Sequence, residues 1–487
     1  MPDTLAPRPA RTHAALGDAF FDVVEPARFP AHILRHRNQA WAARVGLGAL
    51  SDAAWIAHFG RFEPLPGSLE APLALRYHGH QFRHYNPDLG DGRGFLFAQL
   101  HDLMDGRLLD LGTKGSGKTP WSRGADGRLT LKGGMREVLA TSLLEALGVE
   151  TSKSFSLIET GESLTRHDEP SPTRSAVLVR LSHSHIRIGT FQRLAFEGDT
   201  ENLARLLDHC VRHYIPEAAA ETRAERAARF FEAVCARVAR MGAQWMAAGF
   251  VHGVLNTDNI NVTGESFDYG PWRFLPRYEP GFTAAYFDHG GLYAFGRQPE
   301  ALLWNLARLG GCLLPLREEA DLTPRLQQAL EGFGAAVQAA FVPQVLRRLG
   351  LAPREPARDR ALAEGFFQAL LDSHAPFEQA FFDWRGGAAR ATQRLLSPAA
   401  DHYEGQAFAA FRAAVADYAP AAPLDHPYLA RTRPCTLLIE EVEALWAPIA
   451  EADDWRPFEA KLADIAAMAE ALGNPLGGPG AASARVG

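Results

Sequence analysis

The spacing of apolar and polar residues divides the chain into a strand-rich part and a helical part. Residues 94–100 and 107–111 are short apolar runs separated by Asp105-Gly106, a turn signal between strands. Residues 135–147 then change to apolar positions three and four apart. We therefore expect two strands followed by an amphipathic helix.

Further strands are predicted at 153–159 and 176–181, and the pattern is mostly helical from about residue 200 onward. The clearest helix is 222–247, in which Phe231, Val234 and Val238 fall on one face. Other helices are expected near 51–60, 301–314, 321–349, 359–372 and 402–418, with a last one ending near Leu472.

These patterns predict an α+β protein. A sheet-rich part followed by a helical part is the order of a protein-kinase-like two-lobed fold. The predicted divisions are an N-terminal extension (1–70), an N-lobe (71–195), a C-lobe (196–350), a helical C-terminal extension (351–472) and a disordered tail rich in Gly, Ala, Pro and Ser (473–487).

Composition excludes several classes of protein. The net charge of −7 argues against nucleic-acid binding, which needs a concentrated basic surface. Apolar runs stay shorter than the ~18–20 residues of a membrane span, so no membrane partner is expected. The four cysteines show no Cys-x-x-Cys spacing, which predicts neither zinc nor disulfides. We expect a cytoplasmic protein, with mitochondrial targeting as the alternative because the N-terminus carries Arg8, Arg11 and many alanines.

The segment His252-Gly-Val-Leu-Asn-Thr-Asp-Asn259 has the spacing of the kinase catalytic loop, His-Arg-Asp-x4-Asn. Asp268-Tyr-Gly stands where kinases have Asp-Phe-Gly. The kinase base position is Val254, which cannot accept a proton, and Asp258 stands beside the Asn instead. Asn259 and Asp268 offer the oxygen ligands that Mg²⁺ or Mn²⁺ prefers, and Asp258 is the candidate proton acceptor. The alternative is a turn rich in Asn and Asp.

Two further features of the sequence are compatible with nucleotide binding. Gly90, Gly92 and Arg93 form a glycine cluster that could approach phosphates, or simply a hairpin turn. Lys114 follows a strand, and Glu137 lies 23 residues later on the predicted helix, as in the Lys–Glu ion pair of kinases. An unrelated surface Lys and helix Glu is the competing interpretation.

Arg180 and Arg187 flank Ser182-His-Ser-His185. Two arginines can hold a triphosphate by paired hydrogen bonds, although they could equally be surface residues of a strand–turn–strand unit.

A rival motif overlaps Lys114. Residues 112–119, Gly-Thr-Lys-Gly-Ser-Gly-Lys-Thr, match the Walker A pattern in full. A true P-loop opens directly into a helix, whereas Trp121-Ser-Arg-Gly breaks any helix within two turns of Lys118. A P-loop NTPase is therefore kept only as an alternative.

Together these segments resemble the selenoprotein O family, which are pseudokinase-fold protein adenylyltransferases. The matching segments are Tyr77-His-Gly-His-Gln-Phe82, Leu89-Gly-Asp-Gly-Arg93, Lys114-Gly-Ser-Gly, Thr119 to Gly127, Met135-Arg-Glu137, Arg180 to Phe191, His252 to Asn259, Phe267 to Pro271 and Phe287 to Phe295. They run in family order over roughly residues 15–315.

The resemblance implies an inverted ATP whose α-phosphate faces the acceptor, so that AMP is transferred and pyrophosphate leaves. It implies ATP contacts from Gly90, Gly92, Arg93, Lys114, Asp126, Gly127, Arg180, Arg187 and Asp268. Glu137 would support Lys114, Asn259 and Asp268 would bind Mg²⁺ or Mn²⁺, and Asp258 would accept the proton.

The predicted enzyme is thus a monomeric protein adenylyltransferase acting on Ser, Thr or Tyr hydroxyls of other proteins. The alternatives are a kinase-type phosphotransferase and a non-catalytic ATP-binding scaffold. Two departures from the family are the second lysine, Lys118, and a C-terminus without cysteine, where the family often has cysteine or selenocysteine.

Overall fold

A computed structural model describes residues 6–167, 169–317 and 321–478. Its strands are β1 (Pro9–Ala10), β2 (Phe21–Val23), β3 (Ile33–Arg37), β4 (Leu73–Leu75), β5 (Gly79–Gln81), β6 (His84–Asn86), β7 (Leu96–His101), β8 (Leu108–Lys114), β9 (Leu129–Thr130), β10 (Lys153–Leu164), β11 (Thr173–Ser182), β12 (Phe250–His252) and β13 (Trp272–Phe274).

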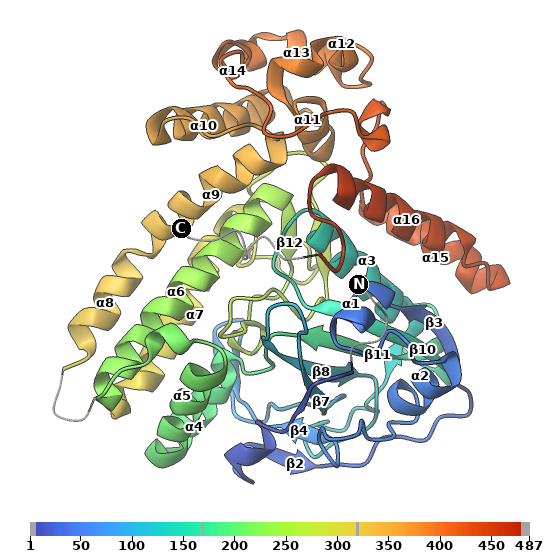
Figure 1. Ribbon diagram of the computed structural model, residues 1–487, viewed down its shortest axis with the longest axis vertical. Helices are drawn as coiled ribbons and strands as arrows, with labels where there is room; N and C mark the ends of the chain where they lie inside the picture. Colours follow the sequence, from blue (N-terminus) through green and yellow to red (C-terminus); the bar gives the residue numbers. More distant parts are fainter. Residues whose placement is uncertain (1–5, 168, 318–320, 479–487) are drawn as a thin grey trace.

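The helices are α1 (Gln39–Arg44), α2 (Asp52–Phe59), α3 (Leu131–Ala146), α4 (Ile188–Glu197), α5 (Thr200–His213), α6 (Arg223–Ala248), α7 (Gln298–Leu313), α8 (Thr323–Glu331), α9 (Phe333–Leu349), α10 (Pro356–Ser373), α11 (Phe377–Asp383), α12 (Ala391–Arg394), α13 (Ala400–Glu404), α14 (Ala409–Val415), α15 (Ile439–Ala452) and α16 (Arg456–Ala471). The predicted α+β class is confirmed, with a sheet in the first part and helices in most of the second (Figure 1).

The sheet has nine antiparallel strands, in the order β2-β4-β7-β8-β11-β10-β3, with β1 beside β7 and β9 beside β11. The strands of the predicted N-terminal extension, β1 to β3, pair within this same sheet, so the sheet shows no break at residue 70. These short edge strands escaped sequence analysis because they lack a sustained alternation of apolar and polar residues.

Helices cover both faces of the sheet. Successive residues of a strand point to opposite faces, so Leu157 of β10 packs toward α3 while Ile158 packs toward α2. On the α2 side, the Trp55 ring stacks on Phe155 with 4.9 Å between ring centroids. The buried face that holds α3 therefore fixes the position of this helix relative to β8.

Local capping explains where helices α3 and α6 begin. The Thr130 hydroxyl accepts a hydrogen bond from the Gly133 amide at the start of α3, and Thr222 does the same for α6. Helix α6 ends at Gly249 (φ 64°), a left-handed conformation that glycine adopts without strain, and the chain turns directly into β12. This turn places the His252 segment beside the sheet.

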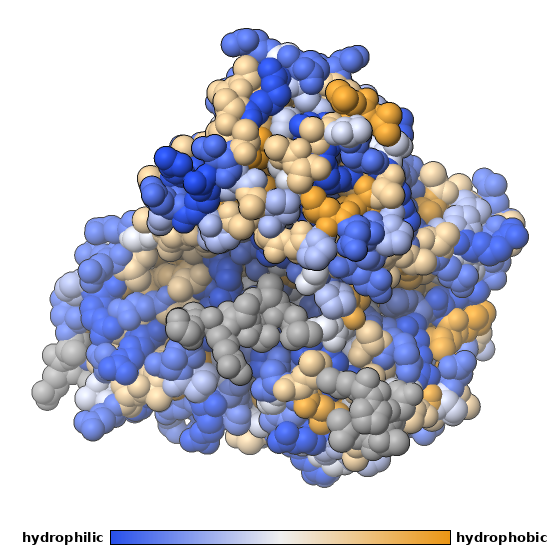
Figure 2. Space-filling model, turned by 45° about the horizontal axis from the view of Figure 1, so that its top comes forward, coloured by the Kyte–Doolittle hydropathy of each residue, from blue (hydrophilic) through white to orange (hydrophobic). Residues whose placement is uncertain are grey.

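The helical part surrounds α6. Helices α7 and α9 pack along α6, and α10 to α14 form a separate apolar cluster at the top of Figure 1. Figure 2 shows apolar residues gathered on these upper helices above a mostly hydrophilic body. Two predicted helices are divided: 321–349 at Gly332, and 402–418 at Gly405, whose extended backbone (ψ 166°) interrupts the helix.

One described stretch, Thr323–Leu349, is long and apolar enough by length and composition to cross a membrane. This corrects the expectation that no run reaches that length. Gly332 divides the stretch into α8 and α9, and α9 packs along α6. A single stretch of this kind is weak evidence for a membrane span.

Residues 473–478 are the described part of the predicted tail, and hydrogen bonds tie them to the body of the protein. The Asn474 side chain donates to the Ala146 carbonyl at the end of α3, and the Gly477 amide donates to Glu145. The disorder predicted from residue 473 therefore does not describe these six residues, and residues 479–487 lie outside the described part.

A buried ion pair joins α1 to the sheet. The guanidinium of Arg44 bonds the carboxylate of Asp102, and both side chains are almost fully buried. We expect Asp102→Ala to lower the free energy of unfolding by about 3–5 kcal/mol, because it leaves a buried cation without its main partner. Urea unfolding measures this, with Asp454→Ala, which removes a surface pair with Arg456, as the control. Equal midpoints for the two variants would contradict the expectation.

Candidate active site

A cavity of about 400 Å³, here called the central cavity, lies between the sheet and the segment that follows β12. Its lining residues are Tyr77, Gln81, Leu89, Gly90, Gly92, Arg93, Lys114, Trp121, Ser122, Arg123, Ala125, Val254, Asn256, Asp258, Asn259, Asp268, Gly270 and Pro271. The fold thus brings together seven of the predicted site residues, namely Gly90, Gly92, Arg93, Lys114, Asp258, Asn259 and Asp268.

Two cations meet on one carboxylate in this cavity. Lys114, at the end of β8, donates to Oδ1 of Asp268 at 3.0 Å, and Nη1 of Arg180, from β11, donates to the same oxygen at 2.9 Å. Lys114 also bonds Glu137 of α3, whose side chain is buried. The predicted Lys114–Glu137 contact is therefore present, and Arg180 joins it through Asp268.

Asp268 is held in an unusual backbone conformation, with φ 62°. A non-glycine residue in the left-handed region is uncommon and signals a local constraint. Burial raises the pKa of this carboxyl, but Lys114 and Arg180 outweigh that effect and hold the pKa well below its usual range. The group is therefore ionised at neutral pH, and its second oxygen is the one available to a metal ion.

Asp258 lies in a short 3₁₀ helix, Thr257–Asn259, and is only 9% exposed. Among the described residues, its Oδ1 atom has no hydrogen-bond partner. Gly79 of β5 backs this carboxylate closely, since a Cβ atom there would lie 2.7 Å from Oδ1. Burial raises the pKa of Asp258 to about 7, although Arg187 favours the charged form.

The neighbouring Asn259 is oriented by the backbone. Its amide nitrogen donates to the Val254 carbonyl at 3.0 Å, which leaves the side-chain oxygen as a potential metal ligand. His252 is buried and bonds the Phe267 carbonyl through Nε2 at 3.1 Å. His252 therefore ties the 3₁₀ helix segment to the Asp268 segment rather than facing the central cavity.

Arg187 lies behind the cavity wall instead of lining it. Its guanidinium stacks over the Tyr77 ring at 4.1 Å, and Nη2 lies 3.5 Å from Oδ1 of Asp91. The side chain is buried, and its positive charge acts on both Asp258 and Asp268. Arg187 thus contributes charge to the site through the wall.

The glycine cluster serves the packing of Trp121. A Cβ atom on Gly90 would lie 2.4 Å from the Trp121 ring, and one on Gly92 would lie 2.8 Å from the Trp121 carbonyl. The indole nitrogen donates to Asp22 of β2 at 2.8 Å. The absence of side chains at these two glycines is therefore needed by a tryptophan that lines the cavity.

Asp126 and Gly127 are not brought into the central cavity. The Asp126 carboxylate pairs with Arg166 at 2.7 Å, and the Gly127 carbonyl accepts a hydrogen bond from Gly117. Arg123 and Ala125, just before them, do line the cavity. The ATP contacts that the resemblance implies for these two residues find no support in this geometry.

The donor atoms of the cavity fit a divalent metal ion that is completed by other ligands. Two carboxylates and one amide oxygen come from Asp258, Asp268 and Asn259, and the Oδ1 atom of Asp258 has no partner among the described residues. Such hard oxygen donors suit Mg²⁺ or Mn²⁺, which commonly keep water and substrate phosphates as further ligands. Within the described ranges no cluster of three or more His, Cys, Asp or Glu residues could hold a metal alone.

The Walker A match does not form a P-loop. Residues 112–114 end strand β8, and no helix opens between Lys118 and Leu131. Lys118 itself is exposed and does not line the central cavity. The P-loop NTPase alternative is therefore wrong.

For the nucleotide transfer that the resemblance implies, we expect Lys118→Ala to stay within about twofold of the unmodified protein, because exposed substitutions change free energies by about 0.5 kcal/mol or less. Initial rates with radiolabelled ATP measure this. Lys114→Ala provides the contrast, since it removes a cation that lines the cavity. If Lys118→Ala lowered the rate of transfer as much as Lys114→Ala does, the P-loop interpretation would be supported instead.

Eleven lining residues of the cavity were not predicted as site residues, among them Tyr77, Trp121, Arg123 and Asn256. Tyr77 and Trp121 fall in segments that carry the family resemblance, but nothing in the local sequence says that their rings face the cavity. Asn256 accepts hydrogen bonds from Phe82 and Tyr293, so it fixes the loop around Asp258. Its place in an Asn-rich turn was the only available signal.

A cavity lined by three basic side chains and by the oxygen donors of Asp258, Asn259 and Asp268 has the composition of a nucleotide- and metal-binding site. Comparison with known proteins also indicates a nucleotide-using enzyme. The family model described as "Protein adenylyltransferase SelO" matches residues 8–466. A protein of Synechocystis sp. described as "Protein nucleotidyltransferase YdiU" is 43% identical over 462 residues, covering 91% of this chain and 94% of the relative.

Proteins with the same description from other organisms are similar. That of Gloeobacter violaceus is 44% identical over 463 residues, covering 91% of this chain and 92% of its own. That of Rhodopseudomonas palustris is 40% identical over 376 residues, which cover 76% of this chain and 74% of the relative. The chain belongs to the SelO protein adenylyltransferase family, which confirms the resemblance and the predicted class of enzyme.

Proposed function

We propose that the chain transfers AMP from ATP to a Ser, Thr or Tyr hydroxyl of another protein and releases pyrophosphate. Membership of a protein adenylyltransferase family supports the reaction class. The observation that carries the assignment to this cavity is that Asp258 is present in its lining while Val254 occupies the position of the kinase base. Both line the central cavity, and only Asp258 can accept a proton.

We assign the binding of the triphosphate to the cations of the cavity. Lys114 and Arg93 line it, Arg180 reaches it through Asp268, and Arg187 supports it from behind the wall. Positive groups fixed before the reaction stabilise the charge that develops as the α-phosphorus is attacked. Glu137 keeps Lys114 in position from α3.

The metal ion would be held by Asn259 and Asp268. When bound, it would neutralise phosphate charge and orient the triphosphate. In the reaction, the acceptor oxygen forms a bond to the α-phosphorus and the bond to the pyrophosphate oxygen breaks. Asp258 takes the proton of the acceptor hydroxyl. The carboxylate of Asp258 lines the central cavity, where the acceptor hydroxyl would enter.

The proposal includes a kinase-like two-lobed fold. The antiparallel sheet with α3 would be the N-lobe, and the helices around α6 would be the C-lobe, with the central cavity between them. The proposal keeps the monomer expected from the sequence. The need for ATP suits the cytoplasmic location predicted from the sequence.

The test is incubation of the purified protein with Mg²⁺ or Mn²⁺ and ATP labelled with ³²P at either the α or the γ position. We expect label on protein from the α position only. Label from the γ position only would establish a kinase. Label from neither, with ATP still bound, would favour the non-catalytic scaffold.

A further inference from the structure

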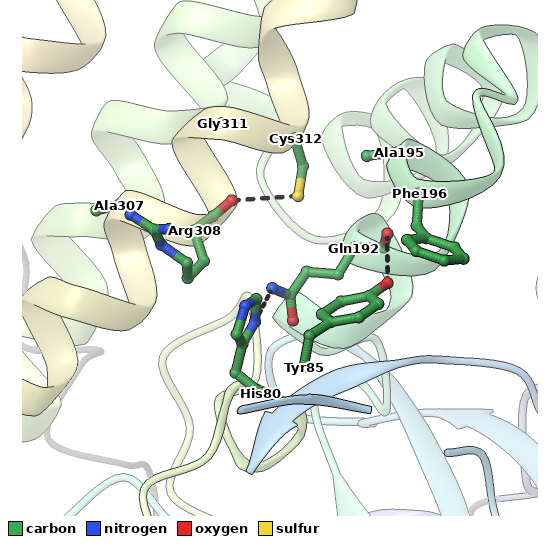
Figure 3. A pocket seen from close by; sticks show the side chains of 9 residues that line it. All are labelled: His80, Tyr85, Gln192, Ala195, Phe196, Ala307, Arg308, Gly311 and Cys312. Carbon is green, nitrogen blue, oxygen red and sulfur yellow. Dashed lines mark hydrogen bonds between the residues drawn. The ribbon is translucent and has the colours of Figure 1, made fainter. Parts of the chain in front are cut away.

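A second cavity of about 380 Å³ lies beside the central one, between the β5–β6 hairpin, α4 and α7 (Figure 3). His80 and Tyr85 come from the hairpin, Gln192 and Phe196 from α4, and Arg308 and Cys312 from α7. In Figure 3 the α7 residues face those of α4 across the opening, and His80 lies below them. None of these residues has a role in the scheme above.

The two cavities share one wall. Successive residues of a strand point to opposite faces, so in β5 Gln81 lines the central cavity while His80 lines the second. The Thr257 hydroxyl accepts a hydrogen bond from the His80 amide at 2.7 Å and donates to Oε1 of Gln192 at 2.5 Å. Gln192 also bonds the His80 ring at 2.7 Å. Thr257 directly precedes Asp258, so these hydrogen bonds connect the lining of the second cavity to the segment of the proposed base.

Helix α4 sets the separation of the two sites. A Cβ atom on Gly189 would lie 3.6 Å from the Asp258 Cα atom, so the start of α4 touches the proposed base. Gln192 follows three residues later, which is about 4.5 Å along a helix axis. The second cavity thus begins less than one helical turn along α4 from the residue that contacts Asp258.

The rim of the second cavity carries an exposed aromatic ring and a cation. Phe196 is 63% exposed, and its ring lies 5.1 Å from that of Tyr85. Arg308 is exposed and lies over the Trp304 ring at 5.1 Å, and it forms no ion pair with any residue the structure describes. Cys312 is buried and its thiol donates to the Arg308 carbonyl, so it acts as an apolar part of the lining.

We propose that this second cavity docks the acceptor protein by taking an aromatic or large aliphatic side chain, with a neighbouring carboxylate on Arg308. This rests on the proposed function, because it supplies the acceptor for AMP transfer. An open, largely apolar pocket with one cation at its rim suits an apolar side chain beside an acidic one. Its occupant is a segment of the acceptor, since the proposed reaction needs one within reach of Asp258.

The test uses two exposed substitutions, Phe196→Ala and Arg308→Glu. Their controls are Leu395→Ala, at a side chain 68% exposed on the upper helices, and Arg433→Glu, at another exposed arginine. The probes are fluorescent peptides with one Tyr, with or without a Leu-Glu or Phe-Glu pair at varied distance from it. Binding is read by anisotropy, and transfer is read with ATP labelled at the α-phosphate.

We expect peptides with the pair to bind at least tenfold more tightly than those without it. Phe196→Ala should remove this preference, Arg308→Glu should remove the part due to Glu, and both variants should bind ATP normally. Equal binding of both peptide sets, or equal preferences in the variants and the unmodified protein, would overturn the proposal. Because binding is read without catalysis, a protein that docks these peptides but transfers no AMP would refute the proposed function and keep the docking site.

Discussion

Asp268→Ala is expected to lower AMP transfer by on the order of 10³-fold or more, since a bound metal ion supplies several kcal/mol of transition-state stabilisation. The same change frees Lys114 and Arg180 from the carboxylate on which both converge. ATP should therefore still bind through these cations, but Mg²⁺ or Mn²⁺ should no longer strengthen its binding. Titration of a fluorescent ATP analogue with and without metal measures this directly.

Asp454→Ala is the matched control, because it removes a surface carboxylate that pairs only locally with Arg456. It should leave both transfer and the effect of metal unchanged. If Asp268→Ala kept metal-dependent nucleotide binding, the assignment of Asp268 as a metal ligand would be wrong.

Asp258→Asn is expected to reduce the rate of AMP transfer by about 10²–10⁴-fold, the usual contribution of a general base. The substitution keeps the size of the side chain but removes its ability to take a proton. ATP affinity should change much less, because the triphosphate contacts proposed here come from Lys114, Arg93 and Arg180. Single-turnover transfer and equilibrium ATP binding separate the two effects.

A second variant distinguishes loss of the proton acceptor from loss of activity through a disturbed structure. Asp258→Glu keeps a carboxylate in the cavity, so it should recover part of the transfer that Asp258→Asn loses, within the space that Gly79 leaves. Asp258→Asn with full activity would move the role of proton acceptor to another group. A large loss of ATP affinity in Asp258→Asn would indicate a role in nucleotide binding instead.

The amphipathic helices were the part of the fold most accessible from the sequence. Residues 135–147 and 222–247 bury one face against the rest of the protein, and they appear as α3 and α6. Their apolar spacing is a direct consequence of that burial. Helix interruptions were missed at Gly332 and Gly405, because a single glycine inside a helical pattern does not reveal whether the backbone turns there.

Within the site, the spacing from His252 to Asn259 and on to Asp268 was informative because a continuous loop fixes these residues close together. The contact of Lys114 with Glu137 also followed from their spacing and is present. Asp126 shows the limit of such reasoning. In sequence it is next to residues that line the cavity, but its carboxylate pairs with Arg166. Arg166 follows β10, 40 residues further along the chain, so local sequence does not reveal this contact.

The single Asp268 oxygen that receives hydrogen bonds from both Lys114 and Arg180 bears on how ATP and metal would bind under the proposed function. Lys114 and Arg180 share a counter-charge within the protein, the Asp268 carboxylate. Under the proposed function, the phosphates of ATP would take over these two cations from Asp268 and leave its carboxylate to the metal ion. Nucleotide and metal should therefore bind cooperatively, each strengthening the other by the same factor.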